Sequence, residues 1–299
     1  MKQTDLKIAG LRVRIELHDE YEGLKMPESY MPFVTEPTND APDVTLTVKS
    51  GYERAAEGMN PVSSGMNDLG EARLYHNGGE YAVDLLPHPS SSFRTMHISE
   101  DFTTGRLQLP GDRYAAFTVD SMLRILYSQA VVLHHGFMLH SAAVVRDGKA
   151  VLFMGKSGTG KSTHAQLWLR EFAGTSLLND DNPVVRVSAD GTVTVYGSPW
   201  SGKTPCYRNA EAPVEAMVRL EQAPVNRYTE LSNIDAFVAV LPGVSVITHS
   251  RKLYGEACNS VVEALKRVKV GKLECTPEPS AAYECQKGIS GEKVLNEIN

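Results

Sequence analysis

Apolar and polar residues alternate along short stretches of the first 115 residues, with the period of a half-buried strand. The alternation predicts strands at 11–17, at 43–49 and twice within 73–86. Asn77-Gly78-Gly79 separates the last two strands and predicts a hairpin turn. Segments 27–42 and 58–70 are rich in proline, glycine and small polar residues, which predicts loops.

The apolar spacing changes near residue 116, where apolar residues recur every three or four positions and predict a helix ending near Gly136. Two apolar strands, 137–145 and 150–154, are predicted next. The patterns farther along predict helices at 259–268 and 280–289 and a strand at 271–276. We therefore predict a β-rich N-terminal region, residues 1–115, packed on a core domain, residues 116–299.

Composition narrows the class of protein. The chain has 299 residues, 42% hydrophobic and 22% charged, with a net charge of −6 and no basic stripe, so we predict no nucleic-acid partner. No run reaches about 18 apolar residues and no signal-peptide pattern begins the chain, which predicts a cytoplasmic protein without a membrane partner. The cysteines lack CxxC spacing, which predicts reduced thiols at Cys206, Cys258, Cys275 and Cys285.

The segment GKSGTGKS, residues 155–162, contains the complete Gly-x-x-x-x-Gly-Lys-Ser pattern of a phosphate-binding loop, between a predicted strand and a predicted helix. Its glycines allow the backbone to curl so that N–H groups face phosphate oxygens. Lys161 is predicted to reach the β- and γ-phosphates of ATP, and Ser162 to bind Mg²⁺. The predicted nucleotide-binding residues are Gly155, Lys156, Ser157, Gly158, Thr159, Gly160, Lys161, Ser162 and Thr163.

A short apolar strand after this helix ends in Asn179, Asp180 and Asp181. A carboxylate at the end of a strand beside a phosphate loop can complete the Mg²⁺ shell, and a second one can accept the proton of an attacking hydroxyl. The alternative is a polar turn without chemistry, because these residue types favour turns. His140, on the predicted strand before the loop, is either a core histidine or a part of the same site.

The segment LHSAAVV…GKAVLFMGKSGTGKSTHA…LLNDDNPVV resembles the kinase core shared by HPr kinase/phosphorylase and ATP-dependent phosphoenolpyruvate carboxykinase. The resemblance implies an α/β fold with a P-loop core of that type. It also implies catalytic or metal-binding roles for His140, Asp180 and Asp181 around a divalent metal, Mg²⁺ or Mn²⁺, beside Lys161 and Ser162. Residues 195–209 lack the glycine-arginine segment of HPr kinases, and residues 1–115 do not resemble the carboxykinase N-terminal domain. The resemblance therefore implies neither HPr phosphorylation nor decarboxylation.

The acceptor side of the site is predicted in two segments. The irregular segment 195–209 offers Trp200, Lys203 and Arg208 for stacking and anion contacts, or forms a structural loop anchored by the tryptophan. Arg251 belongs to a second cationic cluster, for which the start of a solvated helix is the alternative.

Together these features predict an ATP-dependent kinase that phosphorylates a hydroxyl of a small alcohol such as serine, or a seryl residue of a carrier protein or peptide. The alternatives are an NTPase switch and a nucleotide-sensing module. The sequence leaves open ATP, GTP or pyrophosphate as donor, and it is compatible with a homo-oligomer.

Overall fold

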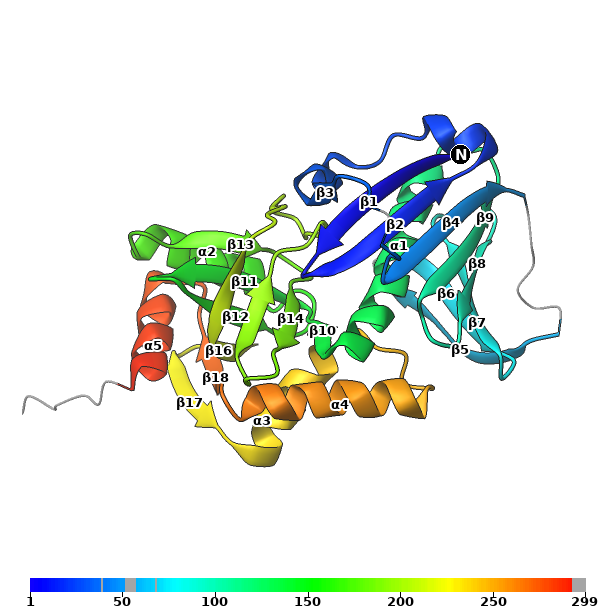
Figure 1. Cartoon of the computed structure of the whole chain (residues 1–299). Helices are drawn as coiled ribbons and strands as arrows, with labels where there is room; N and C mark the ends of the chain where they lie inside the picture. The colour runs from blue at the N-terminus through cyan, green and yellow to red at the C-terminus, as the bar shows by residue number, and fades with distance from the viewer. Residues whose placement is uncertain (39, 52–57, 68, 292–299) are drawn as a thin grey trace, which may run out of the picture. The chain divides into compact units, whose positions relative to one another are not determined.

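The structure, a computed structural model, describes residues 1–38, 40–51, 58–67 and 69–291. The chain divides into two compact units: residues 1–134 with 247–253, and residues 135–246 with 254–299. Each unit is built around a large mixed sheet, nine-stranded in the part of the chain that is described (Figure 1). The protein is therefore of the mixed α/β class.

The first unit contains a sheet in the order β3-β1-β2-β4-β9-β8-β7-β6-β5. Its strands are β1 (Lys2–Ile8), β2 (Leu11–Leu17), β3 (Val34–Thr35), β4 (Val44–Ser50), β5 (Asn60–Asn67), β6 (Gly70–His76), β7 (Glu80–Leu86), β8 (Arg94–Ser99) and β9 (Thr104–Leu109). Two 3₁₀ turns, η1 (Asp19–Gly23) and η2 (Glu28–Phe33), follow β2. The predicted strands and the hairpin at Asn77-Gly78-Gly79 are confirmed, because β6 and β7 pair as antiparallel neighbours.

The prediction of a loop at 58–70 is wrong for the residues described there, since residues 60–67 form β5. This strand pairs with β6 on one side only, and the register shifts between Pro61 and Ser63. An edge strand tolerates proline because the backbone N–H groups on its unpaired side donate to no neighbouring strand, so a missing N–H there costs no hydrogen bond of the sheet. The pairing partner, rather than the local composition, therefore decides the conformation of this segment.

Helix α1 (Ala115–Ala130) and the turn η3 (Val131–His134) belong to the first unit, so the division falls after His134 and not after residue 115. The reason is packing: α1 contacts β4, β8 and β9. A Cβ atom at Gly105 of β9 would lie 2.9 Å from Leu126 of the helix, so this glycine permits the close approach. Residues 115–134 are apolar enough to pass for a membrane span, with a mean hydropathy of 1.2, but 67% of that window is buried, as in a core helix.

The second unit contains the sheet order β10-β14-β15-β16-β12-β11-β13, with β18 paired to β16 and β17 paired to β18. The strands are β10 (Gly136–Met138), β11 (Ser141–Arg146), β12 (Lys149–Met154), β13 (Ser176–Asn179), β14 (Val184–Val187), β15 (Val193–Tyr196), β16 (Glu211–Gln222), β17 (Arg227–Leu231) and β18 (Lys269–Cys275). The helical segments are α2 (Lys161–Glu171), α3 (Asn233–Val240), η4 (Leu241–Gly243), α4 (Arg251–Leu265) and α5 (Pro279–Ser290). Strands β12, β16 and β18 run parallel to one another.

Helices cover both faces of this second sheet. Leu152 and Met154 of β12 join the core cluster that contains α3 and α4 residues, whereas Val151 and Phe153 join the cluster that contains α2 and α5 residues. Because side chains alternate between the faces of a strand, a strand covered on both faces is apolar throughout. The uninterrupted apolar run of β12 is therefore explained by its position between two helical layers.

Candidate functional site

The glycine-rich segment connects β12 directly to α2, as the sequence predicts. Gly155, Gly158 and Gly160 have φ angles of +152°, +81° and +106°, in the region that side chains disfavour. Thr159 closes the loop, because its backbone N–H and its hydroxyl both donate to the carbonyl of Lys156, at 3.1 and 2.6 Å. Ser157 is exposed in the loop, and Ser162 and Thr163 lie in the first turn of α2. The local geometry is that of a strand, a tight loop and a helix N-terminus.

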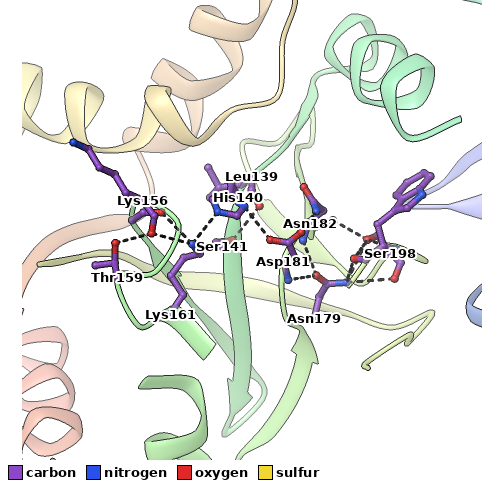
Figure 2. Close-up of polar contacts among 12 residues, drawn as sticks. Leu139, His140, Ser141, Lys156, Thr159, Lys161, Asn179, Asp181, Asn182 and Ser198 are labelled. Carbon is purple, nitrogen blue, oxygen red and sulfur yellow. Dashed lines mark hydrogen bonds and ion pairs between the residues drawn. The ribbon is translucent and has the colours of Figure 1, made fainter. Parts of the chain in front are cut away.

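Lys161 is folded back over the loop rather than extended into solvent, with 8% of its surface exposed. Its Nζ atom donates to the carbonyls of Gly155 and Lys156, at 3.1 and 3.4 Å, and lies 2.9 Å from Nε2 of His140 (Figure 2). Burial lowers the pKa of the ammonium group, while the negative charges of Asp181 and Asp180 oppose this shift. The side chain of Lys161 is thus held against the backbone of the loop.

His140 is not in the middle of a strand, because the predicted strand 137–145 divides into β10 and β11 at Leu139 and His140. The backbone N–H of His140 donates to the carbonyl of Gly243 at 2.8 Å, and that of Leu139 donates to Pro183 at 3.1 Å. The two strands pair with different neighbours, β10 with β14 and β11 with β12 and β13. The break turns His140 toward the loop that follows β12.

The imidazole of His140 bridges Lys161 and Asp181. Its Nδ1 lies 2.9 Å from Oδ1 of Asp181, on the opposite side of the ring from the contact with Lys161 (Figure 2). An ammonium group only donates, so Nε2 of a neutral imidazole accepts here and Nδ1–H donates to the carboxylate. These contacts form a continuous series of hydrogen bonds from Asp181 through His140 to Lys161.

Asn179 directly precedes the two aspartates, and the sequence pattern predicted no function for it. Its Oδ1 accepts the backbone N–H groups of Asp181 and Asn182, both at 2.9 Å, in an Asx turn. Its Nδ2 donates to the carbonyl of Trp200 at 3.0 Å and to Ser198. Asn179 is fully buried. The sequence signal that could have identified it is an amide side chain at the end of an apolar strand, directly before two carboxylates.

The two aspartates therefore have different surroundings. Asp181 contacts His140 and Asn182. Asp180 is 3% exposed, and its Oδ2 accepts the backbone N–H of Thr204 at 3.0 Å. The structure thus brings Asp181 into contact with His140, whereas Asp180 accepts a hydrogen bond from the segment after β15; the charges of both aspartates act on Lys161.

The predicted acceptor-side residues are dispersed. Trp200 is only 4% exposed, which favours the anchoring alternative over stacking on a substrate. Lys203 and Arg208 are exposed in the irregular segment 197–210. The two ends of this segment approach each other closely at Gly197. Only glycine fits there, because a Cβ atom would lie 1.9 Å from the carbonyl oxygen of Arg208. Arg251 begins α4 in the segment that belongs to the first unit.

The predicted metal ligands, Ser162, Asp180, Asp181 and His140, do not form a preassembled cluster. No group of three or more His, Cys, Asp or Glu side chains arranged for a metal is found among the residues described. Mg²⁺ needs only one or two carboxylates when nucleotide phosphates supply other ligands, and it prefers oxygen to imidazole nitrogen. Asp181 and Ser162 offer oxygen atoms, which keep lone pairs for a metal when they accept hydrogen bonds, whereas both ring nitrogens of His140 are already engaged.

A cavity of about 610 Å³ adjoins the loop on the side away from His140, between α2 and the segments that follow β16 and β18. A larger cavity of about 820 Å³ lies among β17, α3 and α4 and is lined by none of the predicted site residues. The predicted site residues therefore do not line the larger of these two cavities.

No family model matches this chain, and no curated protein matches it. Among solved structures, the HPr(Ser) kinase/phosphatase from Coxiella burnetii is similar at 12% identity and a TM-score of 0.29, over 52% of this chain and 94% of that chain.

Proposed function

We propose that this protein is an ATP-dependent kinase that transfers the γ-phosphoryl group to a hydroxyl acceptor. The observation that carries the proposal is the chain of contacts from Asp181 through His140 to Lys161, beside a complete glycine loop. A phosphate loop alone occurs in many nucleotide-binding proteins. The added carboxylate and imidazole supply groups that a phosphoryl transfer uses.

The loop and Lys161 are proposed to bind the phosphates. Backbone N–H groups at the start of α2 and the Lys161 ammonium stabilise negative charge at the transferred group. In the structure the Lys161 ammonium is held by two loop carbonyls and His140. Phosphate oxygens are stronger acceptors than these neutral groups, so a bound nucleotide competes for the same N–H donors.

Asp181 and Ser162 are proposed to hold Mg²⁺ together with nucleotide oxygens, and the ion neutralises phosphate charge when it is bound. Asp181 also fixes the tautomer and orientation of His140. Once phosphate oxygens draw the Lys161 ammonium away from Nε2 of His140, that nitrogen can accept the proton of a hydroxyl as it attacks. Asp180 supports the segment that contains Lys203 and Arg208, where the acceptor is proposed to bind.

The test is a screen of ATP consumption by the full-length protein with Mg²⁺, against free serine, other small alcohols and seryl peptides. We expect slow ADP release alone and a marked stimulation by one acceptor class, with the phosphorylated product identified by mass spectrometry. ATP hydrolysis that no acceptor stimulates would assign water as the acceptor and favour the NTPase switch. Nucleotide binding without any turnover would favour the sensing module.

A further inference from the structure

The cavity of about 610 Å³ lies at the carboxyl ends of three parallel strands, β12, β16 and β18. Ligands of open α/β sheets bind outside the carboxyl ends of the strands, and drug-sized ligands occupy cavities of about 300 to 1,000 Å³. The cavity is lined by loop residues, by the first turns of α2 and by the segments after β16 and β18. Its position is therefore continuous with the phosphate loop.

Apolar side chains form much of the wall, namely Leu167, Leu220, Pro224 and Pro277. A bare polyphosphate offers nothing to pack against such a surface, whereas a nucleobase and ribose do. Gln222 ties this wall to the loop, because its Nε2 donates to the carbonyl of Gly158 at 3.2 Å. The wall and the phosphate loop are thus held together as one site.

His164 adds an unpaired polar group to the same wall. The residue is 3% exposed, and its Nδ1 has no hydrogen-bond partner. Its Nε2 accepts the indole N–H of Trp168 at 3.2 Å, which places the proton of the neutral ring on Nδ1. A buried N–H donor without a partner costs free energy, which a ligand acceptor atom would recover.

The two sides of the loop differ in their chemistry. Strand β12 has β11 on one side, which leads from His140, and β16 on the other, which leads to the apolar cavity. We infer that this cavity binds the nucleoside half of the phosphoryl donor, with the transferred phosphate toward His140, so that the donor is a nucleoside triphosphate and not pyrophosphate. The inference rests on the proposed function, since it assigns the donor of the same site.

Calorimetric titrations of the full chain with Mg²⁺ and either ATP or inorganic tripolyphosphate test the inference. Tripolyphosphate has the same phosphate chain as ATP, without the nucleoside and with greater charge. If ATP binds more tightly, the gain in affinity comes from the nucleoside, as expected if it occupies the cavity. We expect ATP to bind about tenfold or more tightly than tripolyphosphate. Equal affinities in the parent protein would overturn the inference without any variant.

Ala223→Tyr fills the cavity from its rim, and Val225→Tyr is the matched control because Val225 is 62% exposed and does not line the cavity. We expect Ala223→Tyr to weaken ATP to about the tripolyphosphate affinity, with tripolyphosphate itself changed by no more than about twofold. Val225→Tyr should change neither. If a folded Ala223→Tyr variant retains full ATP affinity, the cavity is not the nucleoside site. If the parent binds neither ligand, the proposed function fails together with the inference.

Discussion

Both sheets contain three neighbouring parallel strands. At the carboxyl ends of these strands, the first sheet is covered by a buried side chain, whereas the second is followed by a glycine loop and a cavity. In the first unit these strands are β2, β4 and β9, and in the second they are β12, β16 and β18. After β2 the chain forms η1, where Tyr21 is 3% exposed and donates its hydroxyl to the carbonyl of Leu109 at 2.8 Å. After β12 the chain forms a glycine loop, and a cavity of about 610 Å³ adjoins it.

The comparison shows that the strand arrangement alone does not create a site. In the first sheet the hydroxyl of a buried tyrosine adds a second donor to a strand-end carbonyl that also accepts the N–H of Gly51 at 3.0 Å, which is a structural use of that edge. In the second sheet the Lys161 ammonium donates to two loop carbonyls, and a phosphate would compete with these carbonyls for its N–H groups. The difference lies in the residues that follow the strands, and substitutions on each side can test it.

The largest expected effect is that of Lys161→Ala. Removing the cation at the loop should lower phosphoryl transfer about 100-fold or more, and weaken Mg²⁺-ATP binding about tenfold to 100-fold. Lys149→Ala is the matched control, because Lys149 lies at the other end of β12 and makes an exposed ion pair with Glu215, at 3.5 Å. Calorimetry and transfer rates measure both effects. An unchanged ATP affinity for Lys161→Ala would contradict the assignment of the loop.

The next effect separates the two aspartates. Asp181→Asn should lower transfer about tenfold to 100-fold, because the residue orients His140 and is proposed to bind the metal. Asp180→Asn should instead lower the free energy of unfolding by about 1–3 kcal/mol, because a buried charged acceptor of the Thr204 N–H is lost. Single-turnover rates and urea unfolding distinguish the variants. Identical behaviour of the two would show that the environments in the structure do not set their roles.

A smaller effect concerns the pH dependence of stability that His164, in the wall of the cavity beside the glycine loop, should produce. The pKa of His164 falls from 6.5 in the unfolded chain to about 4 in the fold, so between these values only the unfolded chain binds the proton. This contribution to stability is complete above pH 6.5 and decreases as the pH falls toward 4. It should cost about 2 kcal/mol between pH 7 and pH 5.

Urea unfolding at the two pH values measures this cost in the parent and in His164→Gln. The variant should lose less stability than the parent on acidification, because it lacks the titrating ring. Equal losses in both proteins would show that His164 is not the group responsible.

The smallest effect tests the hydrogen bond of Tyr21 at the carboxyl ends of the parallel strands in the first sheet. Tyr21→Phe should lower the free energy of unfolding by about 1 kcal/mol, because the carbonyl of Leu109 loses a buried donor. Tyr283→Phe is the control, since Tyr283 is 51% exposed and its hydroxyl donates to Glu171 at the surface. The control should change stability by less than about 0.5 kcal/mol. An equal loss of unfolding free energy in both variants would show that the buried hydrogen bond of Tyr21 stabilises the protein no more than the surface one of Tyr283.

The sequence by itself determined the features that depend on neighbouring residues. The loop at 155–160, the apolar strand before it and the helix after it are confirmed because glycine freedom and apolar periodicity act over a few residues. The turn between β11 and β12 is a similar case, since Asp147 and Gly148 have φ angles of +50° and +75°.

Only the tertiary structure decided the features that depend on distant partners. His140 faces Lys161 because carbonyls of Pro183 and Gly243 interrupt its strand. Asp180 and Asp181 diverge because Asn179 binds the backbone on one side and the Trp200 carbonyl on the other. The cavity requires β12, β16 and β18 to lie side by side. Each of these arrangements depends on hydrogen bonds and packing between segments far apart in the sequence, which a local residue pattern does not specify.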